Sequence, residues 1–279
     1  MPRRKATLPQ RISRTGRHIA KAARGFAGFA RRVKRWWRPA PRPAKFMMAA
    51  LVILILWLIS NAIYQVIRKP SELFFPVSGT LNKSPAETWR DYQSLFEKYS
   101  TSVMTPEFLA AIAQVEGSGN PVARTYWRWS FTSQPFEIYR PASSAVGMYQ
   151  ITDGNFAEAR RYCIRDHAVV QDGPWNDWQS CWFNGLYARV LPGHAVELTS
   201  AYLDRSVAAI LERQRVAAAT LQHKQQLAAL IHLCGAGAGD EFARRGFRLT
   251  EGQRCGDTSV RGYLDRVGAM RVVFERLRR

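Results

Sequence analysis

The chain has 279 residues, and its net charge of +20 is distributed very unevenly along them. Residues 1–45 hold fifteen Lys and Arg and no acidic residue, whereas all 21 Asp and Glu lie beyond position 70. The excess charge therefore belongs to a tail and does not indicate a basic folded domain. Metal-ligand spacings such as Cys-x-x-Cys are absent, which argues against a zinc site.

Apolar residues recur every three or four positions in the basic tail, with Lys and Arg between them. They are Ile12, Ile19, Ala23, Phe26, Ala30, Val33 and Trp37. As a helix, this segment would lie on anionic inner-membrane lipids with its apolar face down. Charge alone would also allow nucleic-acid binding, but no motif supports it. A simpler interpretation is a topology determinant with some surface adhesion.

Residues 46–67 form a stretch of twenty-two residues without a charge. At about 1.5 Å per residue it spans roughly 33 Å, enough to cross a bilayer. A cleaved signal peptide is the competing interpretation, but both the basic and the apolar stretches are too long for one. The positive charges before the stretch outnumber Arg68 and Lys69 after it, which places the N-terminus in the cytoplasm and exports the rest.

Four cysteines follow the apolar stretch, and none precedes it. They are Cys163, Cys181, Cys234 and Cys255. This distribution indicates an oxidising compartment and two disulfides, for which three pairings are possible. The sequential pairing would close short loops and contribute about 3 kcal/mol for each bridge. Free buried thiols are the alternative.

The exported part divides into a short linker, residues 68–84, and one domain, residues 85–279. About 195 residues are enough for a hydrophobic core. Apolar residues in helical spacing predict helices over 85–99, within 200–233 and over 260–278. No convincing strand alternation is seen, so we expect a mostly α domain.

A further helix is predicted to begin at Thr105 and Pro106, because a hydroxyl caps a first turn and proline fits its first position. Glycines at 117 and 119 predict its end. The apolar residues at 109, 112 and 113 define a buried face, and Glu116 continues their spacing. Burial disfavours an ionised carboxylate, so Glu116 is a candidate general acid. The alternative is a terminal Glu that turns to solvent.

Six aromatic residues fall between positions 126 and 139, with no helical period. Their rings suit a sugar-binding cleft, although an irregular loop pinned to the core is an equal alternative. The segment 144–150 follows, where a glycine would let the backbone approach a ligand and a glutamine could orient a sugar. The candidate substrate-binding residues are Tyr126, Trp127, Trp129, Tyr139, Ser144, Gly147, Met148, Tyr149 and Gln150.

Two segments together resemble the soluble lytic transglycosylase family, whose catalytic domain has a lysozyme-like fold. Residues 110–121, Ala-Ala-Ile-Ala-Gln-Val-Glu-Gly-Ser-Gly-Asn-Pro, are similar to the family's catalytic helix and turn. Residues 144–150, Ser-Ala-Val-Gly-Met-Tyr-Gln, resemble its Gly-x-x-Gln motif. Residues 234–239, Cys-Gly-Ala-Gly-Ala-Gly, correspond in position to its Tyr-Asn-Ala-Gly motif.

The resemblance implies a periplasmic enzyme of the bacterial inner membrane that acts on peptidoglycan glycan strands. Glu116 would protonate the bond between N-acetylmuramic acid and N-acetylglucosamine and then act as base on the 6-hydroxyl, leaving a 1,6-anhydromuramyl end. No metal or organic cofactor would be needed. Other cell-envelope machinery is a possible partner.

The chain departs from the family where Cys234 and Gly235 replace the Tyr-Asn pair, since that tyrosine commonly contacts the catalytic Glu. Tyr149 or Tyr139 would be candidates to replace it. A muramidase would need a second carboxylate, for which Glu137 and Asp153 are the candidates.

Asp153 more simply caps a helix over residues 155–165. Two further interpretations stay open: a peptidoglycan-binding protein without turnover, and an assembly factor that acts through its basic tail.

Overall fold

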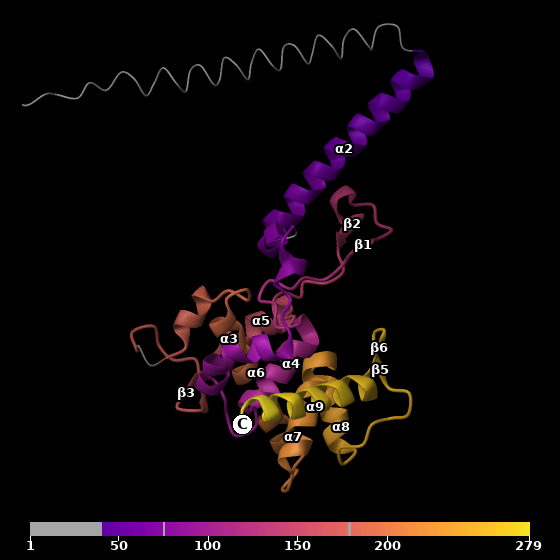
Figure 1. Ribbon diagram of the computed structural model, residues 1–279. Coiled ribbons are helices and arrows are strands. Elements are labelled where there is room, and N and C mark those ends of the chain that lie inside the picture. Colours follow the sequence, from indigo (N-terminus) through magenta and orange to yellow (C-terminus); the bar gives the residue numbers. More distant parts are fainter. Residues whose placement is uncertain (1–40, 75, 178–179) are drawn as a thin grey trace, which may run out of the picture. The chain divides into compact units, whose positions relative to one another are not determined.

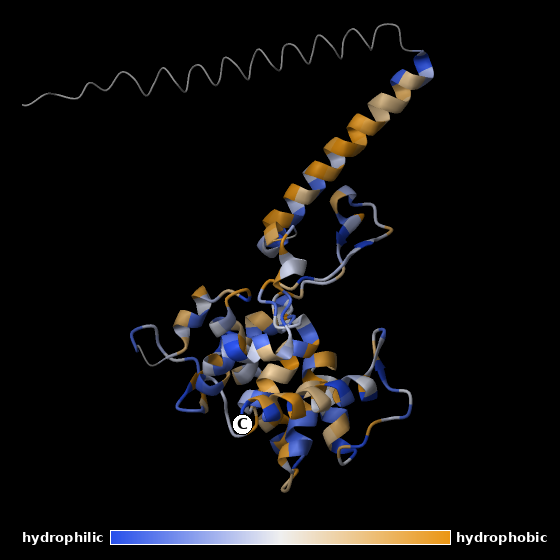
Figure 2. Cartoon of the chain, viewed as in Figure 1, coloured by the Kyte–Doolittle hydropathy of each residue, from blue (hydrophilic) through white to orange (hydrophobic). Residues whose placement is uncertain are grey.

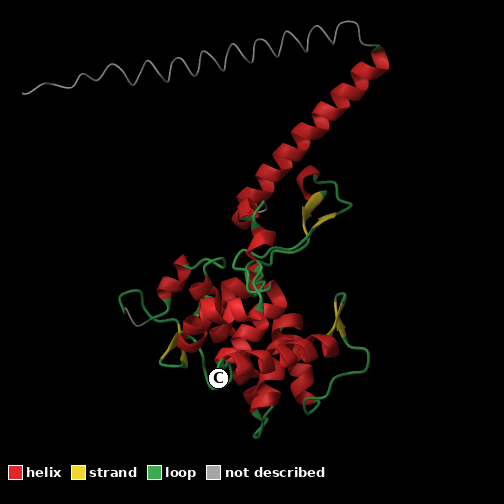
Figure 3. Cartoon of the chain, viewed as in Figure 1, coloured by secondary structure: helices red, strands yellow, loops and turns green. Residues whose placement is uncertain are grey.

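A computed structural model describes residues 41–279 except 75, 178 and 179. The amphipathic helix predicted in the basic tail falls on residues 1–40 and so lies outside the described residues. The described part is mostly helical, and its strands form only short hairpins (Figure 3). The predicted mostly α class is confirmed.

The predicted apolar span forms one continuous helix, α2, Arg42–Arg68. Its most apolar window has a mean hydropathy of 2.5, and apolar residues dominate its length (Figure 2). By length and composition this helix could cross a membrane, which is compatible with a single-pass anchor. The chain divides into two units, Met1–Ile63 and Tyr64–Arg279, so the last turn of α2 belongs to the second.

Six longer helices build the second unit (Figure 1). They are α3 Pro85–Lys98, α4 Pro106–Gly117, α6 Pro192–Arg213, α7 Leu221–Cys234, α8 Ala236–Arg244 and α9 Val260–Leu277. Helix α4 packs along α9 and against α3, and α7 packs against α6 and α8. The predicted cap of α4 is present, since the Thr105 hydroxyl accepts a hydrogen bond from the Phe108 amide.

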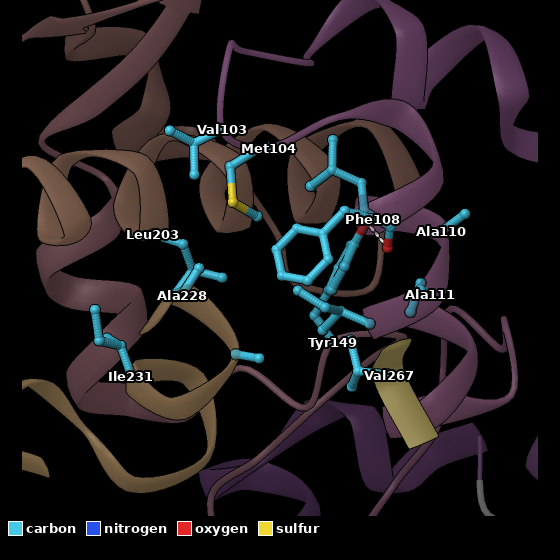
Figure 4. Close-up of a cluster of buried hydrophobic side chains, with 14 of the residues drawn as sticks. Val103, Met104, Phe108, Ala110, Ala111, Tyr149, Leu203, Ala228, Ile231 and Val267 are labelled. Carbon is cyan, nitrogen blue, oxygen red and sulfur yellow. Dashed lines mark hydrogen bonds between the residues drawn. The ribbon is translucent and has the colours of Figure 1, made fainter. Parts of the chain in front are cut away.

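The core lies around α4, whose side chains from Phe108 to Ala113 are buried. Figure 4 shows part of this cluster, which joins residues of α4, α6, α7 and α9 with Tyr149. The Tyr149 hydroxyl donates to the Leu109 carbonyl at 3.1 Å, which satisfies a polar group inside an apolar core. The middle of α4 is therefore packed inside the core, and the last turn of the helix follows this buried part.

Three two-stranded antiparallel hairpins accompany the helices in the described residues, although the sequence shows no convincing strand alternation. They pair β1 Trp127–Trp129 with β2 Tyr139–Pro141, β3 Tyr162–Arg165 with β4 Ala168–Gln171, and β5 Arg254–Cys255 with β6 Thr258–Ser259. Each strand has four residues or fewer, so none is long enough to show a clear alternation of apolar and polar residues in the sequence.

The helix expected over residues 155–165 is wrong in its second half. Helix α5 covers only Asp153–Ala159, and the chain then enters β3. The turn between β3 and β4 explains the change, because Asp166 and His167 both adopt positive φ, of 46° and 61°. Two such residues favour a tight hairpin over a continuing helix.

The segment expected to be a linker folds into two short 3-10 helices, Pro70–Phe74 and Ser78–Leu81. Glu72 in the first is buried and forms ion pairs with Lys69 and Arg124. It also accepts a hydrogen bond from the Trp127 indole at 2.9 Å. Glu72 thus binds the first of these 3-10 helices to Arg124 and Trp127 by an ion pair and a hydrogen bond.

The two predicted disulfides are present, and of the three possible pairings the structure shows the sequential one, Cys163–Cys181 and Cys234–Cys255. The second joins the end of α7 to β5, only five residues before the start of α9 at Val260. The two cysteines are 21 positions apart in the sequence, and their bridge links the segment just before α9 to the end of α7.

Removing this bridge with Cys234→Ser and Cys255→Ser together is expected to lower the free energy of unfolding by about 3 kcal/mol, because the unfolded chain regains loop entropy. Urea unfolding of the full chain in detergent, followed by circular dichroism, measures the change. A loss no larger than that of a surface Ser substitution would contradict a structural role for the bridge.

Candidate active site

Glu116 lies in the last turn of α4, next to the residue that ends it. The helix stops because Ser118 adopts the left-handed conformation, with φ 51° and ψ 39°. Gly117 packs directly on the second motif, since a Cβ there would lie 2.8 Å from both Cα and O of Met148. Because residue 117 is a glycine, the segments 110–121 and 144–150 can pack against each other beside Glu116.

The Glu116 carboxylate has two polar neighbours from distant helices. The Tyr263 hydroxyl, in the first turn of α9, donates a hydrogen bond of 2.5 Å to Oε1. Nε2 of His232, near the end of α7, lies 3.7 Å from the same oxygen. The Glu116 side chain is 17% exposed, so it is largely enclosed yet open to solvent on one side.

Tyr263 is suited to act as a hydrogen-bond donor to Glu116 at neutral pH. Its side chain is buried, and burial together with the negative charge of Glu116 raises the pKa of Tyr263 well above its ordinary value. The phenol therefore keeps its proton at neutral pH. A short hydrogen bond to a carboxylate is among the stronger hydrogen bonds in proteins and fixes the direction of the carboxyl group.

Neither tyrosine proposed from the sequence makes this contact in the structure. The Tyr149 hydroxyl bonds to Leu109, and the Tyr139 ring packs against Trp127 and Trp129, with centroids 5.1 and 4.6 Å apart. The sequence predicted only the helix over residues 260–278 that carries Tyr263. The available signal was that a tyrosine on a buried face needs a partner for its hydroxyl.

A small cavity adjoins His232. It measures about 10 Å³, close to the space that one water molecule needs, and Thr199, Asn155 and Tyr202 also line it. The hydroxyl of Thr199 is buried and has no hydrogen-bond partner in the structure. His232 therefore lies close both to the Glu116 carboxylate and to a cavity whose lining includes polar groups.

The motif at residues 144–150 forms a tight turn beneath the end of α4. Gly147 has φ +80°, and a Cβ there would lie 2.4 Å from the Arg189 carbonyl oxygen. The Gln150 side chain donates to the carbonyls of Ala123 and Gly147, at 3.1 and 2.9 Å. These contacts give Gly147 and Gln150 a clear part in shaping the turn.

The other residues proposed for substrate binding in this motif have different surroundings. Met148 and Tyr149 are completely buried, so their direct contribution is to the core. The Ser144 hydroxyl accepts a hydrogen bond from the Asp153 amide at 3.1 Å and stays partly exposed.

Gly147→Ala is expected to lower the free energy of unfolding by roughly 2–4 kcal/mol, because a side chain disfavours positive φ and would meet the Arg189 backbone. Thermal unfolding of the full chain in detergent measures the loss. Gly154→Ala is the matched control, since nothing lies within 4 Å of its added carbon. Equal melting temperatures for the two variants would contradict the role given to Gly147.

The predicted sugar-binding aromatics lie on the β1–β2 hairpin. Tyr126 and Trp129 are strongly exposed, whereas the Trp127 indole donates to Glu72. The contacts of the hairpin tip run to the last turn of α2, through Phe136. The hairpin that carries these aromatics therefore packs against the end of α2.

The two candidates for a second carboxylate are both ion-paired. Glu137 is buried and accepts hydrogen bonds from Arg68 and Arg140. Asp153 is exposed and pairs with Arg189 at 2.7 Å, while Thr152 caps α5 in its place. The expected capping role of Asp153 is thus taken by its neighbour.

Both carboxylates line a cleft of about 200 Å³, together with Arg68, Lys69 and Ser143. This cleft is larger than the cavity at His232, but Glu116 is not among its lining residues. We place the candidate site at Glu116 because it is a largely enclosed but reachable carboxylate with a tyrosine donor and a histidine beside it, whatever the size of the neighbouring cleft.

Comparison with protein-family models, curated proteins and solved structures finds no match for this chain.

Proposed function

We propose that this protein is a peptidoglycan lytic transglycosylase with a lysozyme-like catalytic domain. The observation that carries the proposal is the hydrogen bond from Tyr263 to Glu116, on a carboxylate that is enclosed but reachable. It supports the resemblance at the point where the sequence departs from the family, because Tyr263 on α9 donates to the glutamate although Cys234 stands where the family has its tyrosine.

In the proposed reaction one residue acts first as acid and then as base. Glu116 gives its proton to the glycosidic oxygen, and the bond from that oxygen to the anomeric carbon of the muramyl residue breaks. The carboxylate then takes the proton of the muramyl 6-hydroxyl as the oxygen of this hydroxyl attacks the anomeric carbon. Tyr263 orients the carboxyl group and stabilises its charged form after the first step.

The proposed location follows from the charge asymmetry around α2. The fifteen basic residues before the apolar stretch favour a cytoplasmic N-terminus. The helical domain and its two disulfides then lie in the periplasm, where disulfides form and persist and where the glycan strands are found. A single anchor keeps the enzyme near the inner face of the wall.

A muramidase is the second candidate, and the cavity beside His232 favours it. That cavity has about the volume of one water molecule, and the unpartnered Thr199 hydroxyl would bind such a water. Attack by water instead of the sugar 6-hydroxyl would leave a reducing end.

The products of digestion separate these functions. We would incubate the full chain in detergent micelles with purified peptidoglycan and determine the masses of the released muropeptides. Products lighter by one water than the reducing forms are expected. Reducing products would favour the muramidase. Sedimentation of the protein with the wall but no release would favour a binding protein without turnover.

A further inference from the structure

The β1–β2 hairpin is attached to the last turn of α2 by three contacts within the unit Tyr64–Arg279. The Gln65 amide donates to the Phe136 carbonyl at 2.6 Å, and the Tyr64 and Phe136 rings stack with centroids 5.2 Å apart. Arg68 forms an ion pair with Glu137. The tip of the hairpin, residues 130–138, therefore lies beside the point where the apolar helix ends.

These contacts determine the depth of the hairpin tip relative to a bilayer that α2 would cross. The uncharged stretch ends at position 67, and Arg68 is the first charge after it. Tyr64 lies one turn earlier, about 6 Å along the helix axis. Phe136 stacks on that tyrosine, so its ring lies at the edge of the apolar stretch, where the acyl chains of a membrane meet the headgroups.

The same hairpin exposes large aromatic side chains. Tyr126 is 70% exposed and Trp129 is 65% exposed, and Phe131 at the tip is fully exposed. Antiparallel pairing of Trp129 with Tyr139 holds the base of the tip rigid. Tyrosine and tryptophan are enriched where a protein crosses the boundary between membrane and water, because their rings are apolar and their polar atoms stay wet.

The charges on the hairpin also fit an anionic lipid surface. Glu137, which such a surface would repel, is held between Arg68 and Arg140. Arg128 adds an exposed positive charge on β1. Basic residues beside a membrane are attracted to acidic phospholipid headgroups by about 1 kcal/mol each.

We propose that the β1–β2 hairpin inserts its tip into the headgroup region of the membrane that α2 crosses, with Trp129 and Phe131 as the anchoring side chains. The partner is a phospholipid surface. The domain would then be held against the bilayer at two points, the end of α2 and the hairpin. This inference is independent of the proposed enzymatic activity.

A fluorescent label at position 131 tests it. All four native cysteines are in disulfides, so Phe131→Cys offers a single thiol for an environment-sensitive probe. The full chain is reconstituted into liposomes of phosphatidylcholine and phosphatidylglycerol. Trp175→Cys is the matched control, because Trp175 is also a large exposed aromatic, with 78% of its surface accessible.

We expect iodide in the buffer to quench the label at 131 at least about threefold less than the label at 175, and lipids spin-labelled near the headgroup to quench it more. Equal accessibility to iodide at both positions would overturn the proposal. Equal protection at both positions would mean general adsorption and would also overturn it. Protection of position 131 by soluble glycan strands, but not by lipid, would assign the hairpin to the wall instead.

Discussion

Glu116→Gln is expected to reduce the release of muropeptides by roughly 10²–10⁴-fold, since general acid–base catalysis contributes about that factor to a rate and the amide can neither give nor take the proton. The amide oxygen can still accept the hydrogen bond from Tyr263, so the fold at the end of α4 is expected to persist. The initial rate of release by the full chain, measured by mass spectrometry of the soluble fraction, checks this result.

Glu107→Gln is the matched control, because Glu107 is a second buried glutamate on the same helix. It pairs with Arg278 at the other end of α4, and its loss is expected to lower stability while leaving turnover nearly unchanged. If Glu116→Gln retains more than about a tenth of the wild-type rate while remaining folded, Glu116 is not the general acid.

Tyr263→Phe is expected to slow turnover by about 10–100-fold. A hydrogen bond to a charged group contributes about 1.5–3 kcal/mol, and each 1.4 kcal/mol corresponds to a tenfold change in rate. Phenylalanine keeps the ring in its buried place on α9, so only the contact with Glu116 is removed. The rate of release and the melting temperature of the full chain are compared in the same detergent.

Tyr149→Phe separates catalysis from stability. It also removes a buried hydroxyl, but one that bonds to the Leu109 carbonyl rather than to Glu116. We expect a loss of about 1 kcal/mol in stability with turnover retained. Equal effects of the two variants on turnover would show that Tyr263 acts only through packing.

Local signals in the sequence were enough to predict the helices that frame the site. Thr105 and Pro106 begin α4 as predicted, and the spacing from position 109 brings Glu116 to the partly enclosed end of the helix. The apolar helix α2 and the last helix α9 also follow from composition and periodicity. Each of these features depends on residues within one or two turns of each other.

The contacts that complete the site could not be predicted in the same way. Tyr263 is 147 positions from Glu116, and their meeting depends on how α9 packs along α4. The β1–β2 hairpin was likewise hidden, because its strands have three residues each and its partners lie more than sixty positions away in α2. Packing between distant elements decides such contacts, and no local pattern records it.

The disulfide between Cys234 and Cys255 links the geometry of the candidate site to the oxidation state of the chain. It holds the start of α9, and therefore Tyr263, to the end of α7, which carries His232. A chain still in a reducing environment lacks this tie, so only the packing of α9 along α4 holds Tyr263 at Glu116. For the proposed enzyme, disulfide formation would then be a maturation step that secures the position of Tyr263 beside Glu116.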